Sequence, residues 1–148
     1  MPITAFDHYT VRCADLDASW SFYRDVLGLR VEPRPLPQTP GTGAPGPRAA
    51  LAFLDGTWLV HLFQATAEQD AIFRRLEPTD AETASWQTGR MHHIALRGTD
   101  AAEMRARMQR HGAVFQERTI GERYQIIVKD PDGVELEINF PAQEGGAG

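Results

Sequence analysis

The segments His8-Tyr-Thr-Val-Arg12 and His93-Ile-Ala-Leu-Arg97 are two copies of one pattern, and they are the strongest indication of the fold. Each runs from a histidine to an arginine through alternating side chains, which is typical of a strand with two different faces. Seven positions after each histidine stands an aspartate, Asp15 or Asp100, suited to begin a helix. A repeat of this kind indicates that the chain contains two copies of one supersecondary unit.

The elements predicted around these segments repeat in the same order, which is a strand, a helix and three further strands. In the first half they fall at residues 6–13, 15–28, 29–32, 49–54 and 57–64. In the second half they fall at residues 91–97, 101–110, 113–117, 124–129 and 134–140. An Asp-Gly pair, Asp55-Gly56 or Asp132-Gly133, precedes the last strand of each half and predicts a tight turn. We therefore predict an α+β fold of two βαβββ modules, over residues 6–64 and 91–140.

Three segments lack the pattern of a strand or a long helix. Residues 33–47 contain six of the ten prolines and predict a long exposed loop. Residues 65–90 predict a linker between the modules, with a short helix around residues 68–76. Residues 142–148 have little apolar surface to bury and predict a flexible tail. We expect a single domain over residues 1–141.

Length and composition are those of one globular domain. The chain has 148 residues, of which 42% are hydrophobic and 24% are charged. A net charge of −5 without a dense basic run argues against nucleic acid as a partner. The sequence shows neither a long apolar run nor a signal peptide, so we expect a cytoplasmic protein without a membrane partner. The single cysteine, Cys13, leaves His, Asp and Glu as metal ligands.

Four side chains stand where the repeat and the strand alternation bring polar groups to one face. The repeat pairs His8 with His93, and it pairs His61 with Glu137 in the last strand of each half. Imidazole and carboxylate groups together suit Fe(II), Ni, Zn, Co or Mn. Each residue taken singly is better explained as a hydrogen-bonded histidine or a solvated glutamate. Their equivalent positions in the two copies favour a metal site.

Two arginines share the parity of these candidate ligands. Arg12 and Arg97 lie on the same strand faces as His8 and His93. Arginine pairs well with a carboxylate or phosphate group, so both are candidates for binding an anionic part of a substrate. The alternative is that they reach solvent or pair with Glu135.

Three longer stretches carry a family resemblance. They are FDHYTVRCADLDASWSFYRDVLGL at residues 6–29, HHIALRGTD at residues 92–100 and DPDGVELEINF at residues 130–140. With them the sequence resembles the vicinal oxygen chelate superfamily, which includes glyoxalase I, methylmalonyl-CoA epimerase, fosfomycin-resistance transferases, extradiol dioxygenases and bleomycin-binding proteins. The resemblance implies that the modules form an incomplete barrel around a divalent metal. It implies the ligands His8, His93 and Glu137, with His61 at a variable position, and a homodimer.

Departures from the family pattern bear on the reaction. A glyoxalase would carry a carboxylate at the position of His61, so this activity is disfavoured. A two-domain extradiol enzyme would have a tyrosine at Ile127, and Tyr124 or His92 is left as a substitute for its active-site residues. Thr10 matches a threonine of the fosfomycin-resistance transferases, but their serine-containing potassium loop is not recognisable here.

Together the residues predict a divalent-metal-dependent enzyme whose small substrate chelates the metal through neighbouring oxygens. A dioxygenase-like reaction with Fe(II) is the first hypothesis. An isomerase, lyase or transferase reaction with Ni, Co, Zn or Mn is the alternative, and a metal-free protein that sequesters a small molecule is the hypothesis from another class. His61 would be a ligand or the catalytic general base. The residues expected to bind substrate are Thr10, Arg12, Arg97 and Tyr124.

Overall fold

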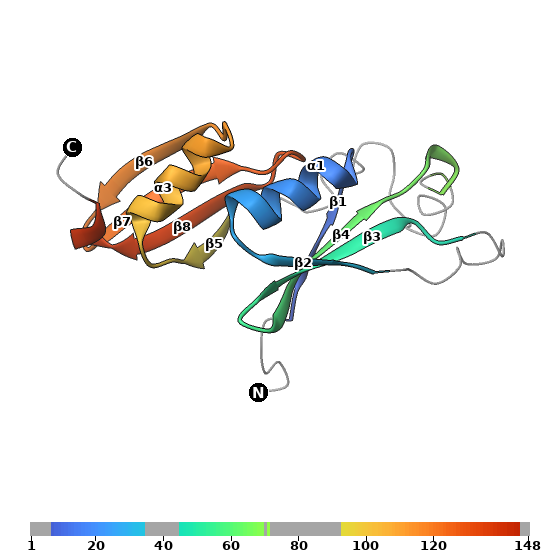
Figure 1. Cartoon of the computed structure of the whole chain (residues 1–148), viewed down its shortest axis with the longest axis horizontal. Coiled ribbons are helices and arrows are strands. Elements are labelled where there is room, and N and C mark those ends of the chain that lie inside the picture. The colour runs from blue at the N-terminus through green and yellow to red at the C-terminus, as the bar shows by residue number, and fades with distance from the viewer. Residues whose placement is uncertain (1–6, 35–44, 70, 72–92, 146–148) are drawn as a thin grey trace. The chain divides into compact units, whose positions relative to one another are not determined.

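The computed structural model describes residues 7–34, 45–69, 71 and 93–145 of the chain. Within these residues the chain forms two four-stranded sheets and few helices, which confirms the predicted α+β class (Figure 1). The strand order is β1-β4-β3-β2 in one sheet and β5-β8-β7-β6 in the other, so the two predicted modules have the same topology. Each is an open sheet and not a closed barrel.

The first sheet consists of β1 (Tyr9–Arg12), β2 (Arg30–Pro33), β3 (Arg48–Leu54) and β4 (Thr57–Gln64). Strand β1 runs parallel to β4, and β3 forms an antiparallel hairpin with β4. The hairpin turn is the predicted one, because Asp55 and Gly56 have φ angles of 48° and 77°, as a two-residue type I′ turn requires. Alternation along β4 buries Val60 and Leu62 completely and leaves His61 on the other face.

The second sheet consists of β5 (Ile94–Arg97), β6 (Phe115–Ile120), β7 (Arg123–Lys129) and β8 (Glu135–Pro141), and helix α3 (Ala101–Arg110) lies across it (Figure 1). Strand β5 is parallel to β8, and β7 is antiparallel to both of its neighbours. Helix α3 begins as predicted after Asp100, whose carboxylate accepts a hydrogen bond from the Glu103 N–H at 3.0 Å. Strand β6 extends beyond the predicted range 113–117, because it continues to a hairpin with β7 at Gly121, which has a φ of 57°.

Helix α1 (Leu16–Ser21) continues into a π-helical turn (Phe22–Val26) and ends at Gly28, whose φ of 74° favours glycine. The chain divides into a first unit of residues 1–16 and 31–91 and a second unit of residues 17–30 and 92–148. Residues 17–30, which include all of this helix except Leu16, therefore belong to the unit of the second sheet. In sequence, however, the helix lies between β1 and β2 of the first sheet.

Hydrogen bonds from α1 and its π-helical turn explain this grouping. The Ser19 hydroxyl donates to Asp132 at 2.5 Å, and the Tyr23 hydroxyl donates to Asp130 at 2.9 Å. Both donors are fully buried and both acceptors lie in the turn between β7 and β8. A buried hydroxyl needs a partner, and the second module's turn supplies one to each.

Asp130 also organises that turn. Its Oδ1 accepts hydrogen bonds from the backbone N–H groups of Asp132 at 3.0 Å and Val134 at 2.8 Å. Only 5% of the residue is exposed, and this burial raises the pKa of its carboxyl group above the ordinary value, although the hydrogen bonds work in the opposite direction. The predicted Asp-Gly turn is thus also the anchor of a distant helix.

Several predicted segments lie partly outside the described residues, namely the first strand before residue 7, the loop at 35–44, the linker at 70 and 72–90, the strand at 91–92 and the tail at 146–148. His92, a candidate for an extradiol-type role, is therefore also outside the described residues. Residues 67–69 are helical, at the start of the predicted linker. The predicted tail begins with a 3₁₀ helix, Ala142–Glu144, because the Glu144 carboxylate accepts a hydrogen bond from the Ala101 N–H at 2.9 Å. Among the described helices, none is long and apolar enough to cross a membrane.

Candidate functional site

The first unit brings two of the predicted ligands into contact with one aromatic ring. His8 directly precedes β1, and His61 lies in β4 opposite Thr10 in the parallel register. The Trp58 ring stacks on His8, with ring centroids 4.0 Å apart and planes at 13°. The same ring meets His61 edge to face, with centroids 5.8 Å apart. His8 and His61 are therefore held beside each other by Trp58.

A β-bulge puts Trp58 on this face. Simple alternation along β4 would place Trp58 with Val60, on the side opposite His61. In the β3–β4 hairpin, however, Val60 pairs with Ala52 and Trp58 pairs with Phe53, so Leu59 is an extra residue between them. The sequence alone does not predict Trp58 beside His61, because strand alternation gives no sign of the extra residue Leu59.

Two polar atoms of this aromatic face have no partner. The Trp58 Nε1 and His61 Nε2 atoms are buried and make no hydrogen bond with any group in the described part of the chain. Burial lowers the pKa of His61 below its ordinary value, and electrostatic interactions with the nearby His8 and Arg34 lower it further. His61 is therefore a neutral imidazole near pH 7, with a buried nitrogen available to a ligand.

Asp7 fixes the orientation of His8. The two side chains make a hydrogen bond of 3.1 Å between His8 Nδ1 and Asp7 Oδ2. With Nδ1 donating to the carboxylate, Nε2 of His8 carries the free lone pair. Metal-binding histidines commonly donate their other ring N–H to a carboxylate in this way. The arrangement is the one that a histidine ligand at position 8 would need.

The second unit holds the other two predicted ligands in a polar network. Glu137 lies on β8 and is only 7% exposed. Its Oε2 accepts a hydrogen bond from Arg118 at 3.2 Å, and its Oε1 accepts one from the Asn139 amide at 2.9 Å. His93 Nε2 lies 3.9 Å from Glu137 Oε2. The buried carboxylate is therefore neutralised by an arginine and lies beside the predicted histidine.

Gln125 closes this network. Its amide oxygen accepts a hydrogen bond from Arg118 Nε at 2.6 Å, and its amide nitrogen donates to Asn139 Oδ1 at 2.9 Å. Gln125, Arg118 and Asn139 were not predicted as site residues, although Asn139 has the parity of Glu137. A glutamine between Tyr124 and Ile126 in a predicted strand is the sequence signal that could have identified the network, because a buried amide there needs partners.

The residues predicted to bind substrate have different environments. Thr10 is exposed on β1, and the Arg12 guanidinium lies 5.5 Å from the centre of the Phe63 ring. Arg97 is exposed on β5, in register with Asn139. Thr10 and Arg12 thus lie in the unit of His8 and His61, and Arg97 lies in the unit of His93 and Glu137.

Tyr124 lies on the opposite face of β7 from Gln125. It is 5% exposed and stands in register with the buried Phe140. Its hydroxyl donates to Glu117 and accepts a hydrogen bond from Arg105 of helix α3 at 2.7 Å. Burial raises the pKa of Tyr124, and the bond to Glu117 raises it further. The structure therefore does not bring Tyr124 together with Glu137.

Each unit thus contains one pair of predicted ligands, His8 with His61 in the first and His93 with Glu137 in the second. Within the described ranges, no group of three or more His, Cys, Asp or Glu side chains is close enough to hold a metal ion. The donor atoms are imidazole nitrogens and a carboxylate, which suit Fe(II), Zn, Mn, Ni and Co. The unpartnered nitrogen of His61 and the oriented ring of His8 fit such an ion.

A sequence model of the Glyoxalase/Bleomycin resistance protein/Dioxygenase superfamily matches residues 5–138, which is most of the chain. No curated protein matches the sequence significantly. Solved structures at low identity share the fold. The lactoylglutathione lyase from Agrobacterium tumefaciens is 21% identical, with 95% of this chain and 96% of that chain covered and a TM-score of 0.56.

Three further solved structures belong to two proteins whose described roles differ from that of the lyase. The fosfomycin resistance protein FosX from Listeria monocytogenes is 17% identical, with coverages of 97% and 98% and a TM-score of 0.62. A mutant of it, in complex with Mn(II) and 1S,2S-dihydroxypropylphosphonic acid, is 16% identical, with coverages of 97% and 96% and a TM-score of 0.62. The antibiotic binding protein TnmS3 from Streptomyces sp. CB03234 is 21% identical, with coverages of 95% and 98% and a TM-score of 0.58.

Proposed function

Because the chain belongs to the Glyoxalase/Bleomycin resistance protein/Dioxygenase superfamily, we propose that it is a divalent-metal-dependent enzyme acting on a small molecule with neighbouring oxygen atoms. His8, His93 and Glu137 would hold the metal, and His61 would be a further ligand or a general base. When bound, a divalent metal supplies Lewis-acid polarisation of the substrate's oxygens. The observation that carries the proposal is the buried His61 Nε2, which has no partner in the described residues.

The chain's own residues support this role in two ways. The lowered pKa keeps His61 neutral near pH 7, as both a metal ligand and a general base require. The hydrogen bond to Asp7 orients His8 and leaves its Nε2 for coordination. Both groups are thus prepared before any ligand arrives, which lowers the free energy needed to organise the site.

Our first proposal for the reaction is dioxygenase-like chemistry with Fe(II). Its support is the donor set, since two histidines and one carboxylate are the set that non-haem Fe(II) oxygenases use. An isomerase, lyase or transferase reaction with another metal is the alternative. Its support is the fold shared with a lactoylglutathione lyase and with a FosX mutant that was solved with Mn(II).

A protein that sequesters a small molecule without chemistry is the second candidate function. The observation that favours it is the aromatic face of the first unit, where His8 and Trp58 are stacked and the Arg34 guanidinium lies 5.6 Å from the centre of the Trp58 ring. Such a surface can stack on a flat ligand. The antibiotic binding protein TnmS3 shares this fold.

Elemental analysis of protein purified anaerobically tests the proposal. Iron at about one ion per chain, together with O₂ uptake on a catechol or hydroxy-keto compound, is the result expected for the first reaction. Another metal with isomerase, lyase or transferase activity would support the alternative. A chain that cannot be loaded with any divalent metal, but that binds flat organic molecules, would overturn the enzyme and favour the sequestering protein.

The variant His61→Ala separates the two roles proposed for His61. If His61 is a ligand, the variant binds metal more weakly. If it is a general base, the variant keeps its metal, loses activity and no longer shows the acidic limb of the pH–rate profile that His61 would give. The exposed His111, in the turn after α3, provides the matched control His111→Ala, which should change neither property.

We also propose a homodimeric state and a cytoplasmic location. A homodimer is expected to have twice the 16.5 kDa mass of the chain, which light scattering would measure. A cytoplasmic location is expected from the sequence, and fractionation of cells that express the chain would test it.

A further inference from the structure

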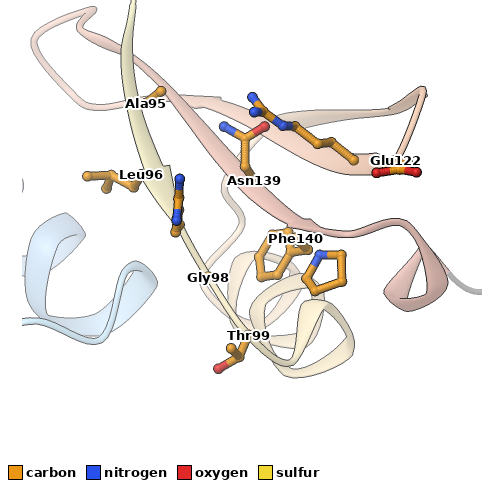
Figure 2. Close-up of a pocket in the computed structure, with 10 residues that line it drawn as sticks. Ala95, Leu96, Gly98, Thr99, Glu122, Asn139 and Phe140 are labelled. Carbon is orange, nitrogen blue, oxygen red and sulfur yellow. The ribbon is translucent and has the colours of Figure 1, made fainter.

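The second unit contains a cavity of about 470 Å³ at the end of β5 (Figure 2). Its lining includes Arg97, Gly98, Glu122, Arg123, Asn139 and Phe140. This volume is within the range of about 300–1,000 Å³ that is usual for small-molecule sites. Phe140 forms an apolar wall against Gly98, where a side chain would clash, because an added Cβ would lie 2.5 Å from the Phe140 ring.

Strand register brings two arginines to this cavity from both sides of β8. Arg97 on β5 is paired with Asn139, and Arg123 on β7 is paired with Pro141. Figure 2 shows the Asn139 amide on one side of β5 and the Leu96 side chain pointing away on the other. The polar and cationic groups of the cavity therefore come from three adjacent strands, which hold them in fixed relative positions.

Arg97 and Arg123 are unusual among the arginines of the described residues, because only their two side chains make no hydrogen bond, ion pair or ring contact. Arg105 and Arg118, in contrast, each bind a carboxylate. The one carboxylate that lines the cavity belongs to Glu122, so its ionised side chains sum to one net positive charge. Two unpaired guanidinium groups at one cavity are suited to an anion with two or more oxygens.

The cavity adjoins the polar network of Glu137. Asn139 uses its amide nitrogen for Glu137 Oε1 and its amide oxygen for Gln125, so its side chain is held between the network and the cavity. Asn139, which lines the cavity, is two residues after Glu137 on β8. Two residues along a strand span about 7 Å. One small molecule is long enough to reach from the cavity to Glu137.

We propose that Arg97 and Arg123 form a binding site for the carboxylate or phosphoryl group of a small molecule. The site itself is independent of any metal. Its further meaning rests on the proposed function: the group bound there is the anionic end of the substrate, whose neighbouring oxygens lie toward Glu137. The substrate class is then a small anion with vicinal oxygens.

Titration of the metal-free full chain with inorganic phosphate, and separately with acetate, tests the site by amide chemical shifts. Saturable shifts should map to β5, β8 and the β6–β7 turn. Arg97→Gln and Arg123→Gln should each weaken binding at least about tenfold, because each removes a charged hydrogen-bond donor. Glu122→Gln should strengthen binding, because it removes the opposing charge. The control Arg110→Gln removes an exposed arginine of α3 that pairs with Glu103 and should leave binding unchanged.

Preference for phosphate over acetate would identify a phosphoryl group, and the reverse would identify a carboxylate. Equal binding by the wild type and both arginine variants, or no saturable binding of either anion, would overturn the site. Unfolding curves of the variants should match the wild type, since neither arginine makes a contact whose loss could unfold the chain.

Metal affinity of the same variants separates this inference from the proposed function. Arg97→Gln and Arg123→Gln should bind a divalent metal as the wild type does. If metal binds normally and the anion does not, only the anion site fails. If the anion binds and no metal does, the anion site stands, while the proposed function and the assignment of the anion as its substrate's end both fail.

Discussion

The two units build the same sheet topology and put opposite chemistry on corresponding strand faces. In the first unit, His8, Trp58 and His61 form an aromatic face on which two buried nitrogen atoms lack partners within the described residues. In the second unit, the Glu137 carboxylate accepts hydrogen bonds from Arg118 and Asn139, and both of these side chains are also bonded to Gln125. One face is prepared for an added ligand, and the other already neutralises its charge internally.

The repeat places equivalent side chains at the same positions of the two sheets, but it does not determine the charges and hydrogen bonds around them. Glu137 and His61 are equivalent in the repeat, but their surroundings differ. The Arg118 guanidinium lies 3.2 Å from the Glu137 carboxylate and forms an ion pair with it. Burial lowers the pKa of His61, and nearby charge lowers it further, so His61 is neutral near pH 7. A buried carboxylate needs compensation, because the cost of burying an unpaired charge is high. Arg118 provides this compensation.

The largest expected effect comes from removing that carboxylate. Glu137→Gln should lower divalent-metal affinity by more than about 100-fold, because loss of even an outer hydrogen-bond partner of a ligand costs about 10- to 100-fold. Calorimetric titration with Mn(II) measures it. Glu103→Gln, on the exposed side of α3, is the control, and equal affinity in both variants would show that Glu137 is not a ligand.

Removing the cation should have the opposite effect on metal binding. Arg118→Gln should raise divalent-metal affinity, because the Glu137 carboxylate no longer has a competing positive charge. The same variant should lose about 1–2 kcal/mol of unfolding free energy, since it breaks a charged hydrogen bond from a half-exposed arginine. Calorimetry and urea unfolding check the two signs. A variant that binds metal more weakly would mean that Arg118 supports the site and does not compete for it.

A pair of conservative variants compares the unsatisfied face with the satisfied one. Gln125→Met should cost about 2 kcal/mol of unfolding free energy, because the half-exposed Arg118 and the partly buried Asn139 amide each lose a hydrogen-bond partner. Trp58→Phe should cost less than about 1 kcal/mol, because it keeps a ring and removes a donor that has no partner in the described residues. Urea unfolding of both variants measures the contrast, and equal losses would contradict it.

The smallest expected effects are changes in the pH dependence of stability, and they have opposite signs in the two units. The pKa of His61 is lowered from 6.5, so its contribution is complete above pH 6.5 and is lost as the pH falls through the folded-state pKa. The pKa of Asp130 is raised from 3.8, so stability is complete below pH 3.8 and is lost as the pH rises through the folded-state pKa.

Unfolding free energies measured from pH 3 to pH 8 should separate these two groups. Asp130→Asn can still accept the backbone hydrogen bonds, so its stability relative to the wild type should increase with pH. His61→Gln should gain relative to the wild type as the pH falls below 6.5. Parallel pH profiles for all three proteins would show that neither group titrates differently on folding.

Much of the fold follows from the sequence, because its signals are local. Strand β4 and helix α3 lie at their predicted residues, and the Asp55-Gly56 turn has the predicted geometry. The partner of helix α1 is not local. It depends on Ser19 and Tyr23 reaching the turn at Asp130, more than a hundred residues away in sequence.

The strand faces of the candidate site are also predictable from the sequence, but its contacts are not. Parity places His61 and Glu137 on the correct faces, because strand alternation has a fixed period. It fails for Trp58, because the bulge at Leu59 adds a residue that no sequence pattern marks. It also gives no sign that Arg118 would reach Glu137, because that contact depends on the pairing of β6, β7 and β8.

The most direct test of the account is a calorimetric titration of the metal-free chain with Mn(II), compared among the wild type, His8→Ala in the first unit, His93→Ala in the second and the control His111→Ala. We expect one ion per chain for the wild type and the control, and at least about 100-fold weaker binding for each of the other two variants. Unchanged binding in either His8→Ala or His93→Ala, or no binding by the wild type, would contradict it.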